Sequence, residues 1–133
     1  MILTAAQVHK ILDLQTQTVM AGELLLYGNM ENASYAAGST PYVKQSVQFN
    51  SSNQLELGNQ SRKKKEGTLI FEVHYRSNTG SAARNALYDK IDAGFGLKSL
   101  GGVILLGVQS LGERGALNWV IDAHLIPFYF YSI

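Results

Sequence analysis

Two pairs of acid–base side chains are the residues of this chain most able to do chemistry: Glu72 with His74, and Asp122 with His124. The members of each pair stand two residues apart in a strand-like segment, so they would project from one face. If the two strands are neighbours, two imidazoles and two carboxylates converge, and such ligands can bind zinc. The polar face of an amphipathic strand carries polar residues in any case, and no third motif supports the site. We therefore expect neither a metal nor a catalytic centre.

The sequence offers no other catalytic machinery. It contains no cysteine, which excludes thiolate metal sites, cysteine nucleophiles and disulfides, and it has no Gly-x-Ser-x-Gly turn. His9 falls on the surface of a predicted helix. Gly94-Phe95-Gly96 lacks the remaining glycine of a dinucleotide loop and follows a helix rather than a strand, so no cofactor is expected. These observations predict a protein that is not an enzyme.

A basic run, Arg62-Lys63-Lys64-Lys65, precedes Glu66 and Gly67 in a chain whose net charge is only +1. Four adjacent cations can contact a few phosphates and give salt-dependent, sequence-blind nucleic-acid binding. The favoured interpretation is a solvated loop tip between two strands. A third possibility is that the run meets an acidic patch on a neighbouring subunit.

Four consecutive aromatic residues, Phe128-Tyr129-Phe130-Tyr131, follow Pro127 near the end of the chain. They could pack over the edge of a sheet, with the two phenylalanines inward and the two tyrosines outward. Alternatively another subunit could bury them, because aromatic side chains are favoured anchors of interfaces. Both alternatives stay open at this point.

Hydrophobic periodicity predicts the elements that hold these residues. Thr4 and Gln7 fit a capping box at the start of a helix. The predicted elements are helices over 4–20 and 81–93 and strands over 23–27, 43–49, 68–76, 102–108 and 117–127. A flexible hairpin loop is expected over about 50–66, and the apolar 102–108 segment should be a central strand.

Two of these strands have a predicted orientation. Apolar residues of the first should face the core, namely Leu69, Phe71, Val73 and Tyr75. In the last strand, Trp119, Ile121, Ala123 and Leu125 should face inward and Asn118, Asp122 and His124 outward.

Composition and element order together predict the fold class. With 133 residues, 46% hydrophobic and 16% charged, the chain is long enough for one globular domain over 1–133. We predict an α+β two-layer sandwich, with a mostly antiparallel sheet of about five strands and two helices packed on one face. The longest apolar runs, 103–108 and 125–131, are far shorter than the roughly 20 residues that span a bilayer. A soluble protein of a reducing compartment, without a membrane partner, is expected.

The order of these motifs resembles the tail-terminator-like proteins of long-tailed bacteriophages. The resemblance runs from about Thr4 to Phe128 and rests on short motifs in sequence order. They are the N-terminal helix, a short strand leading to Glu31-Asn32, Pro41-Tyr42-Val43, the basic turn into Gly67, Gly80 with a helix ending near Phe95, and Asn118-Trp119-Val120-Ile121.

The resemblance implies a virion structural protein, assembled in the host cytoplasm, that forms a homo-oligomeric ring, usually a hexamer. Such a ring lies at the head-proximal end of the tail tube, stops tube polymerisation and joins the tail to the head connector, while DNA passes through its lumen without specific binding. A head-completion or tail-tube protein of the same virion is the first alternative, and a small nucleic-acid-binding domain is the second. The residues expected at a subunit interface or lumen are Arg62, Lys63, Lys64, Lys65, Glu66, Glu72, His74, Phe128 and Phe130.

Overall fold

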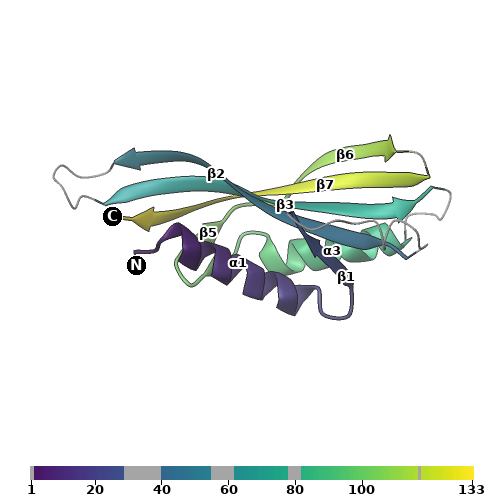
Figure 1. The fold of residues 1–133 in the computed structure, drawn as a ribbon, viewed down its shortest axis with the longest axis horizontal. Helices are drawn as coiled ribbons and strands as arrows, with labels where there is room; N and C mark the ends of the chain where they lie inside the picture. The colour runs from purple at the N-terminus through teal and green to yellow at the C-terminus, as the bar shows by residue number, and fades with distance from the viewer. Residues whose placement is uncertain (1, 29–39, 55–61, 78–81, 117) are drawn as a thin grey trace.

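Seven strands and two helices make up the part of the chain that the computed structural model describes, residues 2–28, 40–54, 62–77, 82–116 and 118–133 (Figure 1). In chain order they are α1 (Ala5–Val19), β1 (Leu24–Tyr27), β2 (Tyr42–Gln54), β3 (Lys63–Arg76), α3 (Ala82–Phe95), β4 (Ser99–Leu100), β5 (Val103–Leu105), β6 (Gln109–Ala116) and β7 (Trp119–Ser132).

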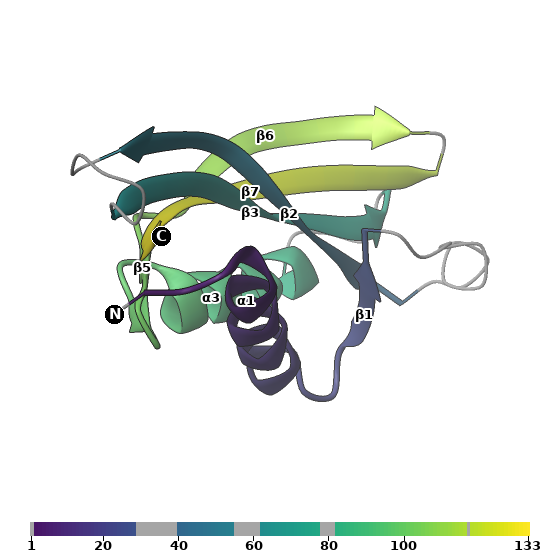
Figure 2. The ribbon, with the colours of Figure 1, turned by 60° about the vertical axis from the view of Figure 1, so that its left-hand side comes forward.

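All seven strands belong to one mixed sheet, in the order β1-β2-β3-β7-β5-β4, and β6 also pairs with β7. β1 runs parallel to β2, and every other pairing is antiparallel. The sheet is curled into a half-barrel, as the turned view in Figure 2 shows. The predicted five-stranded sandwich is therefore wrong: the described chain is mostly β, with more strands and one parallel pairing.

The additional strands carry little sequence signal. β6 reads Gln-Ser-Leu-Gly-Glu-Arg-Gly-Ala, without alternation of apolar and polar residues. It is a strand because its backbone pairs with β7, from Gln109 opposite Leu125 to Ala116 opposite Trp119. The predicted central strand over 102–108 is also wrong, since only Val103–Leu105 is strand and it lies one position from the β4 edge.

Both helices cover the same face of the sheet (Figure 2), and this face is called the inner face below. The capping box is confirmed: the Gln7 amide N–H donates to the Thr4 hydroxyl, and the Thr4 N–H donates to the Gln7 side chain. Leu12 of α1 and Ile91 of α3 are fully buried against the sheet. The opposite, outer face has no helix over it in the described residues.

The predicted orientation of β3 is confirmed, because its inner-face residues Leu69, Phe71 and Val73 are fully buried. The predicted orientation of β7 is wrong. Asp122 and His124 are buried, while Ile121 and Leu125 on the outer face are only half-buried. Side chains of a strand alternate strictly between faces, so the burial of the phenylalanines further along β7 places Asp122 and His124 inward as well.

Candidate functional site

The two acid–base pairs lie on opposite faces of the sheet. β3 and β7 are neighbours, as a shared site would require, but their register pairs Phe71 with His124 and Val73 with Asp122. Glu72 and His74 therefore project outward while Asp122 and His124 project inward. The described residues contain no group of three His, Cys, Asp or Glu side chains that could hold a metal ion.

On the outer face, His74 belongs to an aromatic cluster. The Tyr42 ring stacks on the His74 ring at 4.5 Å between centroids, and Trp119 meets Tyr42 edge-on at 5.2 Å. Burial lowers the pKa of His74 below its ordinary value of 6.5, and the nearby Glu72 carboxylate opposes this only in part. Glu72 itself accepts a hydrogen bond from Arg114 at 2.8 Å. His74 is thus a neutral packing residue.

On the inner face, an ionic cluster joins the first turn of α3 to β6 and β7. Arg84 forms an ion pair with Glu113, and its guanidinium also lies 3.7 Å from an Asp122 oxygen. The Ser110 hydroxyl donates to Asp122 at 3.3 Å, and the His124 Nε2 atom lies 3.5 Å from Asp122. A hollow of about 230 Å³ adjoins this cluster.

This inner cluster is not arranged for nucleophilic catalysis. Among the described residues, neither ring nitrogen of His124 has a hydrogen-bond partner, so the imidazole does not contact the Ser110 hydroxyl, whose acceptor is the Asp122 carboxylate. Burial lowers the pKa of His124, and the Asp122 carboxylate opposes the shift. The cluster therefore fixes α3 to the sheet by charge and keeps a neutral imidazole beneath the Tyr88 ring, 4.7 Å away.

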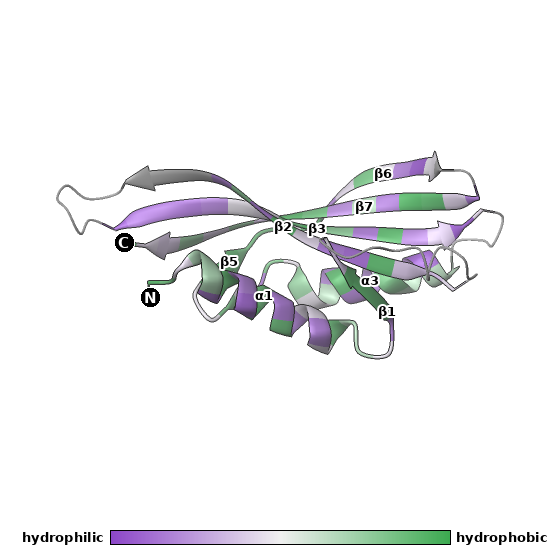
Figure 3. Cartoon of the chain, viewed as in Figure 1, coloured by the Kyte–Doolittle hydropathy of each residue, from purple (hydrophilic) through white to green (hydrophobic). Residues whose placement is uncertain are grey.

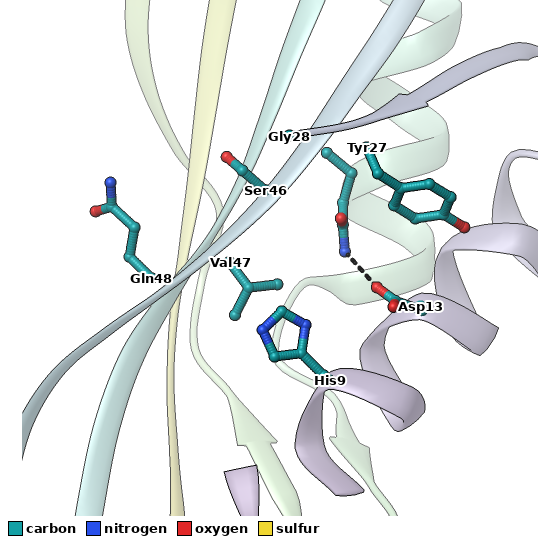
Figure 4. Close-up of a pocket in the computed structure, with 8 residues that line it drawn as sticks. His9, Asp13, Tyr27, Gly28, Ser46, Val47 and Gln48 are labelled. Atoms are coloured by element: carbon teal, nitrogen blue, oxygen red, sulfur yellow. Dashed lines mark hydrogen bonds between the residues drawn. The ribbon is translucent and has the colours of Figure 1, made fainter. Parts of the chain in front are cut away.

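A groove of about 700 Å³ separates α1 from β2 (Figure 4). His9 and Asp13 of α1 line one wall, and the stretch from Gln45 to Gln48 lines the other. The buried Gln45 side chain donates to Asp13 at 3.1 Å and so bridges the two walls. Polar side chains dominate the lining, but they supply no pair of charged groups that would hold a small ion.

Along this groove, the backbone of β2 has an open edge. β1 pairs only with the first four residues of β2, from Tyr42 to Gln45. From 46 to 54, β2 pairs with β3 on one side, and no other described strand pairs with it on the other. We call residues 46–54 the open β2 edge.

The basic run lies in a strand rather than in the predicted loop. Lys63, Lys64 and Lys65 pair with Ser132, Tyr131 and Phe130 of β7, and with β2 on the other side. Figure 3 shows this hydrophilic end of β3. Residues 55–61 of the predicted hairpin loop lie outside the described part of the chain.

Alternation divides the basic run between the two faces. On the outer face, Arg62 lies over the Tyr131 ring at 5.5 Å and Lys64 over the Tyr129 ring at 4.5 Å. Glu66 shares this face and lies 3.8 Å from the Lys64 ammonium. Lys63 and Lys65 belong to the inner face, because they pair directly with the buried Ser132 and Phe130.

Phe128 and Phe130, expected at an interface or lumen, are buried by the chain itself at 2% and 0% exposure. Phe49 of β2 meets both rings edge-on at 6.0 Å. Tyr129 and Tyr131 are half-buried on the outer face. This matches the alternative in which the phenylalanines point inward and the tyrosines outward.

Sequence reasoning missed two features of these surfaces. The first is the ion pair between Arg84 and Glu113. Neither residue belongs to a motif, and a single charged residue in a helix or a turn-like segment predicts no partner. The open β2 edge was missed because pairing partners are a property of the sheet order. A long segment with no charge and no proline was its one visible sign.

Comparison with known proteins identifies no family. No family model matches the chain, and no curated protein matches it. One solved structure superposes with a TM-score of 0.63, covering 94% of this chain and 91% of the other, at 12% identity. That likeness concerns the fold alone. No helix in the described residues has the length and apolar character needed to cross a membrane.

Proposed function

We propose that the protein is a virion structural protein that closes into a ring at the head-proximal end of a bacteriophage tail tube. Bound to the last ring of the tube, it stops tube polymerisation and presents its other side to the head connector. The resemblance of the sequence to tail-terminator-like proteins suggests six copies in the ring. The proposed action is steric and involves no bond-making chemistry.

The observation that carries the proposal is a strand arm that projects past the helices (Figure 1). This end of the sheet is formed by the last residues of β2 and the first residues of β3, paired from Ser51 with Glu66 to Gln54 with Lys63, and the last residues of β7 pair with β3 beside them. On its outer face this end of the sheet carries Lys64, Tyr129 and Tyr131, all half-buried, whereas Phe128 and Phe130 belong to the core of the protomer. An arm of this kind can reach a neighbouring copy.

Mass in solution and negative-stain imaging of the purified chain test ring formation directly. A single closed ring of fixed mass supports the proposal, and long tubes would assign the chain to the tube instead. The stricter test adds the chain to growing tail tubes. Tubes should stop at a capped end, and growth at an unchanged rate with bare ends would refute the proposal.

Nucleic-acid binding is the second candidate, favoured by the stacking of Arg62 and Lys64 on two tyrosine rings. Cations interleaved with aromatic rings form the usual platform for single-stranded nucleic acids. The alternation of the run supplies a matched test. Arg62→Ser with Lys64→Ser removes two outer-face charges, and Lys63→Ser with Lys65→Ser removes two inner-face charges.

Anisotropy measurements with a labelled single strand at low and physiological salt separate the outcomes. Loss of binding only in the outer-face variant would favour a nucleic-acid platform. Equal weakening in both variants would indicate nonspecific attraction, and no binding by the wild-type chain at low salt would remove this candidate.

A further inference from the structure

The sheet has two long open edges, and they lie on opposite sides of it. One is the open β2 edge. The other is β6, which pairs with β7 on one side and with no other strand in the described part of the chain. β4 also ends the sheet on that side, but it contains only two residues. β2 and β6 are therefore the two edges long enough to pair with another chain.

The open β2 edge lacks the charged and proline side chains that protect natural edge strands against pairing, and the two charges of β6 are paired within the chain, although both edges contain a β-bulge. Natural edge strands are blunted by lysine, proline or inward-pointing charges, because a row of unpaired N–H and C=O groups recruits other strands. The open β2 edge contains no charged residue and no proline. In β6, Glu113 and Arg114 are engaged within the chain by Arg84 and Glu72. Leu111, also in β6, is 67% exposed.

Strand direction makes the two edges complementary. Every pairing along the path β2-β3-β7-β6 is antiparallel, so β2 and β6 run in opposite directions. A second copy that keeps the same strand direction then presents its β6 antiparallel to the first copy's β2. Contact between two different edges is heterologous, and it generates a ring when its rotation closes.

The curl of the sheet supplies a rotation from one copy to the next. Each edge contains a β-bulge, between Phe49 and Ser51 in β2 and between Ser110 and Glu113 in β6, and bulges increase local twist and bending. The open β2 edge lies at the level of the C-terminal half of β7, with β3 between them, whereas β6 pairs with the N-terminal half of β7. Neighbouring copies are therefore offset along the strands, as in closed barrels, whose strands tilt relative to the axis.

We propose that the ring closes by antiparallel pairing of the open β2 edge of one copy with β6 of the next, so that the sheet continues from protomer to protomer. The α1–β2 groove receives the side chains that the incoming β6 directs toward the helices. This inference rests on the proposed ring-forming function and names the surface through which the ring forms.

Site-directed cross-linking tests the pairing, because the native chain contains no cysteine. Two single variants are made, Gln48→Cys on the open β2 edge and Leu111→Cys on β6, both at exposed side chains. They are mixed under conditions in which the wild-type chain forms rings. A bis-maleimide with a spacer of about 10 Å, twice the spacing of neighbouring strands, tolerates small differences of register.

The mixture should shift from monomer to covalent dimer, while each variant alone stays monomeric. The control replaces Gln48→Cys by Thr18→Cys, an exposed site on α1, and should give no dimer with Leu111→Cys. Dimers of Gln48→Cys alone would mean a symmetric β2–β2 contact and would overturn the proposal. Closed wild-type rings without any cross-link in the mixture would overturn it too, while leaving the ring function intact.

A second experiment introduces a lysine on each edge, because a charged side chain opposes strand pairing there. Gln48→Lys with Leu111→Lys should abolish rings without changing the thermal midpoint of the protomer, whereas Thr18→Lys should leave rings unchanged. Rings that persist in the double variant would contradict the edge pairing. A wild-type chain that never forms rings would instead refute the proposed function itself.

Discussion

At Gly67 the sheet leaves room for a hydrogen atom and nothing larger. A Cβ at this position would lie 2.5 Å from the Gln48 carbonyl oxygen and 2.5 Å from Cζ of Phe128. Phe128 pairs with Gly67 across β3 and β7, so its ring lies over the glycine. A glycine therefore stands at position 67 because the buried Phe128 ring and the Gln48 carbonyl leave no room for a Cβ.

Gly67→Ala is therefore expected to destabilise the chain by about 1–3 kcal/mol, the usual cost of overpacking a close-packed site. Gly115→Ala is the matched control, since a Cβ there would meet nothing within 4 Å. Urea unfolding followed by circular dichroism measures both. Equal unfolding midpoints for the two variants would contradict the packing described.

Two buried histidines, His74 and His124, make folding stability depend on pH. Burial lowers the pKa of both below 6.5 in the folded chain, so the unfolded chain binds protons at a higher pH than the folded one. The free energy of unfolding is then highest above pH 6.5 and falls as the pH decreases toward the folded-state pKa values. Each unit of difference in pKa corresponds to about 1.4 kcal/mol.

The free energy of unfolding should accordingly be lower at about pH 5 than at about pH 7.5, both well within the range of histidine titration. His74→Gln with His124→Gln should flatten this dependence. The same slope in the double variant would assign the acid sensitivity to carboxylates instead.

Among the elements, β7 shows most clearly what sequence patterns can and cannot predict. Over residues 119–125 the apolar side chains stand mainly at odd-numbered positions, and over residues 126–130 the large ones that are buried stand at even-numbered positions. The sequence cannot say which of the two sets faces the helices; the core that buries Ile126, Phe128 and Phe130 decides it. Ion pairing of Asp122 with Arg84 then makes the burial of a carboxylate tolerable.

Short-range sequence signals predict the elements in which they occur. The capping box of α1 and the alternation of β3 follow from short-range chemistry, and both were predicted correctly. β6 has no such signal, since its Ser, Gly and charged residues do not alternate with apolar ones. It is a strand because it pairs with β7, which follows it in the chain. For the same reason, the sequence predicts a loop for the basic run, whereas pairing with β2 and β7 makes Lys63 to Lys65 part of a strand.

The alternation of β7 between the two faces predicts destabilisation of very different size for two adjacent aromatic residues. Phe130→Ala should destabilise the protomer by about 3–5 kcal/mol, as removal of a buried ring usually does. Tyr131→Ala, on the outer face, should cost about 1 kcal/mol or less. Thermal unfolding of dilute protein measures both. A Phe130→Ala variant that loses rings but keeps the wild-type midpoint would place that ring in an interface.

At the scale of the whole molecule, the sheet is assembled from segments far apart in the chain. β3 pairs over its full length with β7, from Lys63 opposite Ser132 to Arg76 opposite Trp119. β5 and β6 pair with β7 as well. β7 therefore joins three parts of the sheet, β1–β2–β3, β5–β4 and β6, and its loss would separate them.

This dependence on β7 has a consequence for the order of events during synthesis. β7 follows every other strand of the described chain, so a nascent chain exposes an edge of β3, the β4–β5 hairpin and an unpaired β6 until β7 emerges. Non-local pairing of this kind is typical of domains that fold in milliseconds to seconds rather than microseconds. Stopped-flow refolding should show a phase in that range, and a chain truncated after Ile126 should remain unfolded. Microsecond refolding would show instead that the first half of the sheet folds without its last strand.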